Sequence, residues 1–541
     1  MKDSTPLTDR FVNASWIVIP LAFGFLSLSY GQDANWDLRN YHWYNPYAFL
    51  NHRLGIDLGA AHNATFYNPI VDLPLFLLAH LLPARAVGFV LGVVHGLNYV
   101  ALYALSRATL ADAAPLWPRL SLNAVCALVA LIGVTGGGHL GLVGTTFNDN
   151  LVSLLLLGAA IVLARRPELW RAEHESLSRS VLSAVLTAGS MVGLAVGLKL
   201  PTAPFAVGFC AGFFCVGGSF SRRALLAFIF GLAVVAGFAL AGGPWMWMLW
   251  RDYANPLFPY FNTIFKSPLG MAQDYRDTRF LPEGPFGWFA FPVVFSLDPK
   301  KVGEVAFQDF RILAAYCVLL GTMVCGVLRP SVRAAIPHPL KYLISVAAIT
   351  YVAWIAVFGI YRYIVPLEML APLLIAGAIS AWPLRLKGAG AAALFATLLL
   401  TARPADWLRQ PWRTGPFVHV VPPPVENPGQ ALAIITGTDP VAWVIPAFPP
   451  EIPFLRIFGY LAMPEHTENG LNKRARAIID AHRGAFYLLF PQNEQSNAES
   501  SLAAYGLTPD FESCRAVESN LGDYVRWCRV YRSDTSAAAP T

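Results

Sequence analysis

Apolar runs of about 20 residues, the length that crosses the hydrocarbon core of a bilayer, recur along most of the chain. The stretch 67–82 is either an additional span or a helix at the membrane interface, and the apolar piece 286–297 is too short to span. The runs predict about 11 spanning helices, at roughly 13–30, 84–106, 120–135, 149–164, 181–198, 202–220, 224–242, 308–328, 342–360, 364–382 and 388–403.

The pattern changes near residue 404, where the apolar runs shorten to the length of strands. Strands separated by helical segments are typical of an α/β domain, and the proline-rich stretch 416–428 is its predicted linker. The predicted fold is a polytopic α-helical membrane module (1–403) with long outer loops, followed by a small C-terminal α/β soluble domain (404–541). The predicted strands are 431–436, 486–490 and 524–531, and the predicted helices are 471–483 and 495–505.

Composition supports a membrane protein and excludes several other classes. Of the 541 residues, 55% are hydrophobic and 13% are charged, whereas a soluble domain has about 25% charged residues. The formal net charge of +6 is spread over short loops, so nucleic acid is not expected as a partner. The first apolar run lacks a small-residue cleavage signature, so we interpret it as a retained helix. Cys514 and Cys528 lie in the polar C-terminal part and could form a disulfide if that part is outside the cytosol.

Basic residues predict the orientation of the spans. If the helices alternate, lysine and arginine recur in every second loop, for example at Arg222 with Arg223. Because basic loops stay in the cytosol, the long loops 31–69 and 243–307 and the C-terminal domain are predicted to lie outside. The high content of Ala, Leu, Arg and Gly is typical of a bacterial inner-membrane protein.

The outer stretch 31–47 is rich in groups that exchange protons and stack on flat or sugar-like surfaces. It holds two acids, Asp33 and Asp37, one arginine, one histidine and five aromatic rings. We interpret Asp37 as a catalytic base at the outer surface of the membrane. The alternative is a solvated loop with an interfacial aromatic belt. The side chains predicted to shape the pocket beside Asp37 are Tyr41, His42 and Tyr44.

The second long outer loop, 243–307, is rich in aromatic residues and proline. Its segments Gly-Pro-Trp-Met-Trp at 243–247 and Asn-Pro-Leu-Phe-Pro-Tyr-Phe-Asn at 255–262 predict stretches without regular helix. The reason is that proline lacks a backbone donor and clashes with the preceding helical turn.

Ionisable side chains at membrane depth are expensive, so they are usually functional or paired. Asp149 opens a predicted helix at the outer face, where it is either a helix cap or a functional group. Lys199 lies between two predicted helices at the same face, and it departs from the positive-inside pattern.

Arg362 is also predicted at the outer face, between two tyrosines, and an arginine fork suits a phosphate. Glu368 follows it into the membrane and either pairs with Arg362 or accepts a hydrogen bond from a substrate. Arg311, beside Asp309, is a weaker candidate of the same kind. Two cations near headgroup depth indicate an anionic lipid, most simply a lipid phosphate. A nearby acid would deprotonate an acceptor hydroxyl.

Several of these segments resemble the glycosyltransferase C superfamily of integral membrane enzymes. Asp37 followed by Tyr41, His42, Tyr44 and Ala48 is similar to its acid-then-aromatic first outer loop. Val-Gly-Leu-Lys-Leu-Pro-Thr-Ala-Pro at 196–204 resembles its glycine-rich helix that ends in lysine. Arg362-Tyr363 followed by Pro366 resembles its arginine-tyrosine-proline helix start, and a soluble domain after the last span is usual there.

The resemblance implies a hexosyl- or pentosyltransferase that uses a polyprenyl-phosphate-linked sugar. Asp37 would be the general base, with Asp33 as an alternative, and Lys199 and Arg362 would contact the phosphate. The acceptor would be a lipid, glycan or protein at the extracytoplasmic face. No cofactor is implied, and the absence of a clear Asp-x-Asp motif favours metal-independent, inverting transfer.

Two other functions fit parts of the same pattern. A transporter or flippase for a lipid-linked glycan would need polar groups near the midplane and often paired repeats. Here the charges gather at one predicted face and no repeat is evident. A non-catalytic assembly protein whose outer domain binds a partner is the other alternative.

Overall fold

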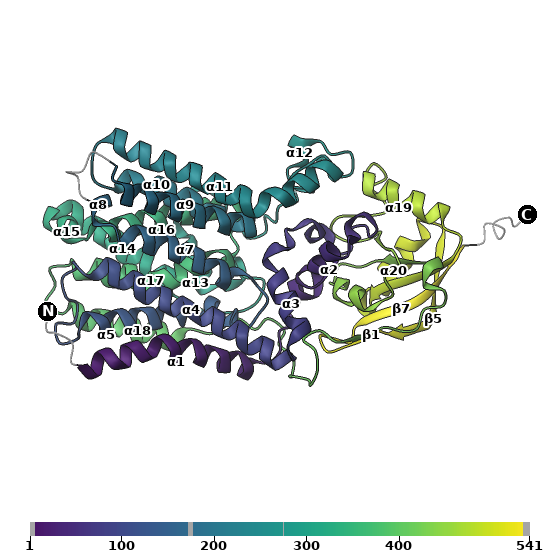
Figure 1. Ribbon diagram of the computed structural model, residues 1–541, viewed down its shortest axis with the longest axis horizontal. Helices are drawn as coiled ribbons and strands as arrows, with labels where there is room; N and C mark the ends of the chain where they lie inside the picture. The colour runs from purple at the N-terminus through teal and green to yellow at the C-terminus, as the bar shows by residue number, and fades with distance from the viewer. Residues whose placement is uncertain (1–5, 171–176, 274, 534–541) are drawn as a thin grey trace, which may run out of the picture. The chain divides into compact units, whose positions relative to one another are not determined.

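The computed structural model describes residues 6–170, 177–273 and 275–533. Its residues form two compact units, each assembled from three segments of the chain. The helices and strands confirm the predicted fold class (Figure 1). We name Met1–Tyr30, Phe89–Pro244 and Asp277–Trp407 the helical unit, and Gly31–Gly88, Trp245–Arg276 and Leu408–Thr541 the sheet unit.

Each of the predicted membrane segments contains a helix. Among the described residues, seven helices are long and apolar enough to cross a membrane, so the total of about 11 spans stays a prediction. The helices that lie wholly or mainly in the helical unit are α1 (Pro6–Tyr30), α4 (Ala84–Leu110), α5 (Leu122–Val134), α6 (Gly137–Gly141), α7 (Asp149–Ala164), α8 (Pro167–Trp170), α9 (Arg179–Leu198), α10 (Ala203–Gly212), α11 (Phe220–Tyr253), α13 (Gly284–Leu297), α14 (Arg311–Leu328), α15 (Pro330–Ala335), α16 (His338–Val357), α17 (Val365–Ser380) and α18 (Lys387–Thr401).

Helix α17 runs through the interior of the helical unit. Every one of its residues is buried, which agrees with a sequence that is apolar on all sides. It packs against α5, α7, α14, α16 and α18. Small residues permit this close packing, because a Cβ on Gly133 would come within 2.6 Å of the Met369 carbonyl oxygen. A Cβ on Gly377 would likewise lie 2.3 Å from the Leu340 side chain.

Helix α11 corrects one prediction about the second long loop. The segment 243–247 was expected to lack regular helix, yet it continues α11, and Pro244 lies inside this helix. Proline costs one backbone hydrogen bond there, and membrane helices tolerate such a loss because local adjustments satisfy the freed carbonyl. The prolines of 255–262 lie in turns, as expected.

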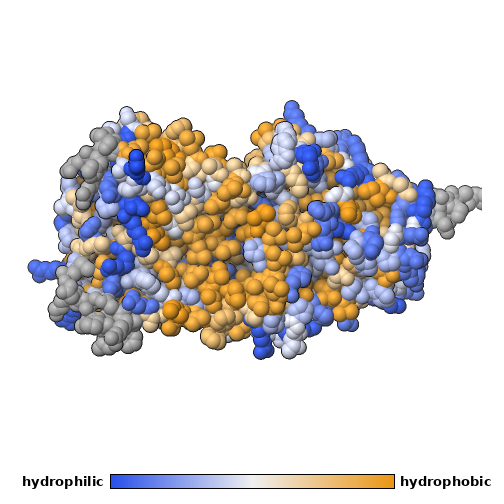
Figure 2. Space-filling view, in the orientation of Figure 1, coloured by the Kyte–Doolittle hydropathy of each residue, from blue (hydrophilic) through white to orange (hydrophobic). Residues whose placement is uncertain are grey.

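The surface of the helical unit is suited to lipid contact. Along α11, Phe228 and Val235 expose 63% and 62% of their area, and Leu240 exposes 74%. Figure 2 shows hydrophobic residues of this kind spread over the visible face of the unit. Apolar area on this scale is what the hydrocarbon core of a bilayer covers.

The sheet unit is organised around a five-stranded sheet with the order β3-β2-β4-β7-β5. Strands β2, β3 and β4 are parallel, and β7 is antiparallel to both of its neighbours. The three predicted strands and two predicted C-terminal helices are confirmed. The strands are β1 (Val420–Val421), β2 (Ala431–Ile435), β3 (Phe454–Arg456), β4 (Ala485–Pro491), β5 (Leu507–Ala516), β6 (Glu518–Ser519) and β7 (Val525–Arg532), and the helices that lie wholly in this unit are α2 (Tyr44–Leu50), α3 (Leu73–Leu81), α12 (Asn262–Phe265), α19 (Gly470–Ala481) and α20 (Gln495–Ala503).

The first long loop, 31–69, is part of this sheet unit. The Leu58 N–H donates to the Phe454 carbonyl (2.9 Å), and the Leu58 carbonyl accepts from the Arg456 N–H (2.9 Å), so Leu58 pairs with β3. Beside it, Arg53 donates to Asp57 from Nε (3.0 Å) and Nη2 (2.7 Å). The Asp57 carboxylate also accepts the Phe454 N–H at 2.9 Å. The long loop that was predicted to hold the catalytic base is therefore fixed to the C-terminal sheet.

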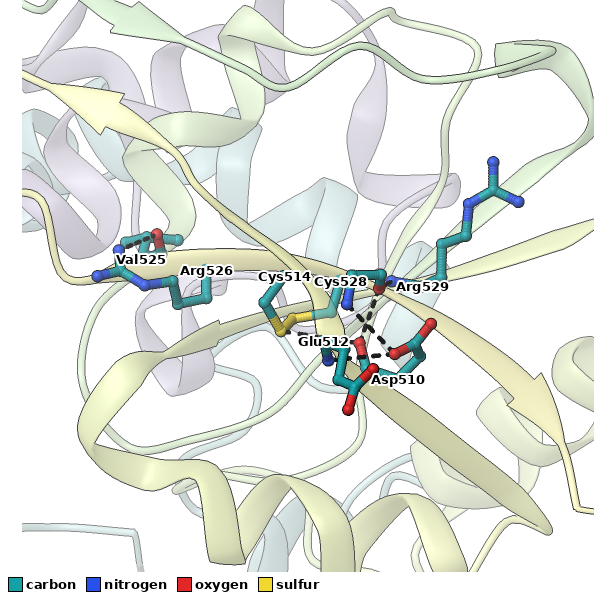
Figure 3. Close-up of a disulfide and its surroundings, with 8 residues drawn as sticks. Asp510, Glu512, Cys514, Val525, Arg526, Cys528 and Arg529 are labelled. Atoms are coloured by element: carbon teal, nitrogen blue, oxygen red, sulfur yellow. Dashed lines mark hydrogen bonds between the residues drawn. A yellow bond between two sulfur atoms is a disulfide. The ribbon is translucent and has the colours of Figure 1, made fainter.

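A disulfide joins two neighbouring strands of the sheet. Cys514 of β5 and Cys528 of β7 are bonded, with Cα atoms 4.1 Å apart and a sequence separation of 14 (Figure 3). The pairing of β5 with β7 shifts register between Asp510 and Arg515, so the bond crosses the irregular part of this ladder. The disulfide suggested by the sequence is present.

The buried Arg53–Asp57 pair is expected to stabilise the sheet unit strongly. Asp57→Ala should lower the free energy of unfolding by about 3–5 kcal/mol, because it leaves a buried guanidinium without its counter-charge. Urea unfolding followed by tryptophan fluorescence measures this. The matched control is Glu426→Ala, which breaks the exposed pair with Arg529 and should cost less than about 1 kcal/mol. Equal costs for the two variants would contradict a clamping role for Asp57.

Candidate functional site

Three helix ends of the helical unit bring Lys199, Arg362 and Asp149 together. Asp149 is the first residue of α7, Lys199 follows the last residue of α9, and Arg362 lies in the short turn Tyr361–Ile364 before α17. Lys199 Nζ lies 2.7 Å from Asp149 Oδ1, and Arg362 Nη1 lies 4.0 Å from Asp149 Oδ2. The exposed fraction of the side chain is only 11% for Lys199, 10% for Arg362 and 4% for Asp149. These three predicted site residues therefore form one largely buried cluster.

Aromatic rings and a second acid complete this cluster. The Arg362 guanidinium lies 4.5 Å from the centre of the Phe147 ring and 5.3 Å from that of Tyr363, and Lys199 Nζ lies 5.7 Å from the Tyr363 ring. Glu304 accepts from Arg362 Nε at 3.1 Å. Cations that are largely buried against ring faces keep a strong field for an anion.

The sequence indicated only part of this arrangement. The cap position of α7 is occupied by Asn148, so Asp149 is available to face Lys199 from the first helical turn. Glu304 was not predicted, because a lone acid in a long loop carries no signal for a partner 58 residues later. Phe147 precedes Asp149 by two residues, and its aromatic character next to a membrane acid is a signal that could have been used.

Glu368 and Arg311 lie in a second, fully buried group of charges. The Glu368 carboxylate accepts the N–H groups of Gly138 (3.0 Å) and His139 (2.9 Å) in α6. Arg311 is fully buried, pairs with Asp309, and donates from Nε to the Ile132 carbonyl at the end of α5 (3.0 Å). These bonds pair backbone groups at the ends of α5 and α6 that would otherwise lack partners. Glu368 and Arg311 are therefore better suited to a structural role than to substrate contact.

In the sheet unit, Asp33 shapes the backbone of the predicted catalytic loop. It is fully buried, and the Asn35 side-chain amide donates to its two oxygens at 2.9 and 2.8 Å. The Asn35 side-chain oxygen in turn accepts the Leu38 N–H at 2.8 Å. This Asx-type arrangement leads into one turn of π-helix, Leu38–His42. Such turns occur often at functional sites, because they redirect side chains.

Asp37 stands at the cap of that π-turn and retains 7% exposure. The Tyr41 hydroxyl donates to Asp37 Oδ2 at 3.1 Å, one turn further along. Tyr41 packs edge-on to Tyr67, with ring centres 5.1 Å apart. The turn thus brings an acid, a phenol and a second aromatic ring together, and the pocket beside Asp37 stays a prediction.

His42 and Tyr44 have buried acid partners of their own. His42 Nδ1 lies 2.8 Å from Asp72 Oδ1, and the fully buried Tyr44 donates to Asp57 Oδ2 at 2.8 Å. Burial is the main cause that raises the pKa of Tyr44 well above its usual value, followed by the nearby Asp57 charge. Tyr44 therefore stays a neutral hydrogen-bond donor within the Arg53–Asp57 clamp.

A further aromatic group beside the loop was not predicted. His62 is stacked near Trp36 (ring centres 6.2 Å apart, planes 17°) and lies 5.0 Å from the Tyr460 ring. Burial and then the nearby Arg456 charge lower the pKa of His62 well below its usual value, so it is neutral at pH 7. Among the described residues, no group of three His, Cys, Asp or Glu is arranged to hold a metal ion.

Asp33 and Asp37 have different surroundings, so substitutions of these two acids are expected to change stability by different amounts. Asp33→Ala should lower the free energy of unfolding by about 1–3 kcal/mol, because the Asn35 amide loses its buried acceptor. Asp37→Asn keeps an acceptor for the Tyr41 hydroxyl, so it should change stability by less than about 1 kcal/mol. Thermal unfolding of both purified variants tests this, and a larger loss in Asp37→Asn would contradict it.

No protein-family model matches the sequence, and no curated protein matches it either. Among solved structures, ArnT from Cupriavidus metallidurans bound to undecaprenyl phosphate is similar, with a TM-score of 0.51 at 12% identity over 98% of this chain and 99% of ArnT. The arabinofuranosyltransferase AftD from Mycobacteria is also similar, with a TM-score of 0.51 at 12% identity over 98% of this chain and 40% of AftD. Identity at this level shows the fold alone. The chain therefore shares its fold with ArnT and AftD.

Proposed function

We propose that this protein is a membrane glycosyltransferase that moves a sugar from a polyprenyl-phosphate donor to an acceptor hydroxyl at the extracytoplasmic face. The observation that carries the proposal is the placement of Lys199 and Arg362 around the single carboxylate of Asp149. This cluster lies at helix ends of a membrane unit, a position that suits a phosphate at headgroup depth. The bound undecaprenyl phosphate of ArnT, a protein of the same fold, supports this chemistry.

Lys199 and Arg362 would bind the donor phosphate. In the protein alone, Asp149 and Glu304 balance their charges, so the cations stay ordered before the lipid arrives. A phosphate oxygen would replace part of these contacts, with Asp149 keeping Lys199 in place. As the bond between the sugar and the phosphate breaks, negative charge grows on the leaving phosphate, and two fixed cations stabilise it most at that moment. Arg311 and Glu368 would support the neighbouring ends of α5 and α6.

Asp37 would act as the general base. The acceptor oxygen attacks the anomeric carbon, the bond from that carbon to the phosphate oxygen breaks, and polyprenyl phosphate leaves. The proton of the acceptor hydroxyl passes to the Asp37 carboxylate, which must lie within hydrogen-bond reach of it. A single displacement of this kind inverts the configuration of the sugar. The residual exposure of Asp37 favours it over the fully buried Asp33, while Tyr41 and His42 would shape the acceptor pocket.

The disulfide supports the predicted location of the sheet unit. A bond such as Cys514–Cys528 persists in oxidising surroundings and is rare in the cytosol. Together with the basic loops of the sequence, it favours a bacterial inner-membrane protein whose C-terminal domain lies in the periplasm.

The phosphate-binding role predicts a loss of donor affinity in Lys199→Gln and Arg362→Gln. Each should weaken binding of undecaprenyl phosphate about 10- to 150-fold, because a charge-assisted hydrogen bond is worth about 1.5–3 kcal/mol. Titration of the purified protein with that lipid measures it. The control is Arg279→Gln, a largely exposed arginine paired with Asp277, which should bind normally. Normal affinity in both test variants would refute the assignment.

The base assignment predicts that Asp37→Asn loses transfer and keeps donor binding. The rate should fall at least about 100-fold, the contribution typical of general-base catalysis, while affinity for undecaprenyl phosphate stays within about twofold. Transfer of a radiolabelled sugar in a reconstituted membrane measures the rate. Full transfer by Asp37→Asn would exclude this role. Movement of labelled lipid between leaflets that is unaffected by the substitution would instead indicate a transporter.

A further inference from the structure

One pocket of the helical unit is lined by none of the residues assigned to transfer. It has a volume of about 450 Å³ and lies between the segment that follows α10 and the start of α16. This volume lies within the range of about 300–1,000 Å³ that is usual for ligand pockets. Its lining consists of Cys215, Val216, Gly217, Gly218, Arg223, His338 and Lys341.

The pocket gathers positive charge, and the described part of the chain places no acid in its lining. Arg223 and Lys341 line it, and Arg333 lies near enough to repel the charge of Lys341. Among the described residues, none of these three forms an ion pair with an acid. Lys199 and Arg362, in contrast, both face carboxylates. Cations held near one another without counter-charges create a potential that attracts an anion.

Two exposed aromatic rings flank, along the chain, the segment 215–218 that lines the pocket. Phe214 and Phe220 expose 43% and 73% of their area, and their ring centres are 5.8 Å apart. Arg223 Nη1 donates to the Phe214 carbonyl at 3.2 Å, which joins this lining residue to the position of one ring. A ligand with an anionic head and apolar chains therefore matches both parts of the site.

We propose that this pocket binds the phosphate headgroup of an anionic phospholipid, with the acyl chains of that lipid lying over Phe214 and Phe220. Arg223 and Lys341 contact the phosphate, and Arg333 adds to the local field. The basic loops of the sequence place this site at the predicted cytosolic surface, where basic pockets between helices are known to hold acidic lipids. The proposal is independent of the proposed transfer reaction and of its residues.

The test is a titration of the full-length, detergent-purified protein with dioctanoyl-phosphatidylglycerol, read as an apparent Kd from thermal shift. The double variant R223Q/K341Q should bind about 30-fold more weakly, since each basic group near a membrane surface contributes about 1 kcal/mol. The charge-preserving variant R223K/K341R should keep its affinity within about threefold. The matched control is R165Q/R166Q, which removes an exposed pair outside the pocket and should bind as the original protein does.

Two further titrations distinguish an anionic phospholipid from a neutral lipid and from free phosphate. Dioctanoyl-phosphatidylcholine should give no saturable shift, because its headgroup has no net charge. Inorganic phosphate at the same concentration should give less than a tenth of the shift, because it lacks chains to cover the rings. Equal affinity of R223Q/K341Q and R165Q/R166Q overturns the proposal, as does an equal response to inorganic phosphate. An unchanged Tm of R223Q/K341Q in the presence of phosphatidylcholine would show that this variant is folded. If the folded variant keeps its affinity for phosphatidylglycerol, the proposed site is wrong.

Discussion

The complete burial of α17 is the constraint on which the helical unit depends. A charge in or beside such a helix is costly unless a partner lies within reach. Arg362, just before α17, therefore lies between Glu304 and Asp149, and Glu368 inside it accepts two N–H groups of α6. A Cβ on Gly136 would collide with Glu368 Oε1 at 2.0 Å, and one on Gly138 would lie 2.7 Å from Glu368 Oε2, so that carboxylate requires glycine at both positions. One buried helix thus determines where several other helix ends lie.

The sheet unit satisfies its buried charges in a related way. Arg53 is neutralised by Asp57, and Arg456 donates to the Ala60 carbonyl (3.0 and 3.1 Å) and the Gly437 carbonyl (2.6 Å). Both arginines therefore connect the loop 31–69 to the C-terminal part of the sheet unit. The loop that contains Asp37 is thus held to a folded layer through its residues 53–60.

The helical unit holds cations in two different ways, and the difference has functional meaning. Around Asp149 the cations are balanced and nearly buried, so an anion entering there exchanges partners within a fixed, low-dielectric frame. Around Lys341 they have no acid partner among the described residues, and exposed rings flank the lining segment 215–218 along the chain. The first arrangement suits stabilisation of charge during a reaction, and the second suits retention of a lipid.

The sequence alone determined the membrane character, the helices, the strands near 431, 486 and 524, and the candidates Asp37, Lys199 and Arg362. These follow from local signals: the period and length of apolar runs, and charges where hydrocarbon excludes them. It did not foresee the continuation of α11 through Pro244, because proline is a weak breaker inside a membrane. Only the tertiary structure decided that Asp149 faces Lys199, that Glu304 faces Arg362, and that Leu58 pairs with β3. Each of those contacts joins residues far apart in the chain, and such pairings depend on how buried charges and backbone groups are satisfied in three dimensions.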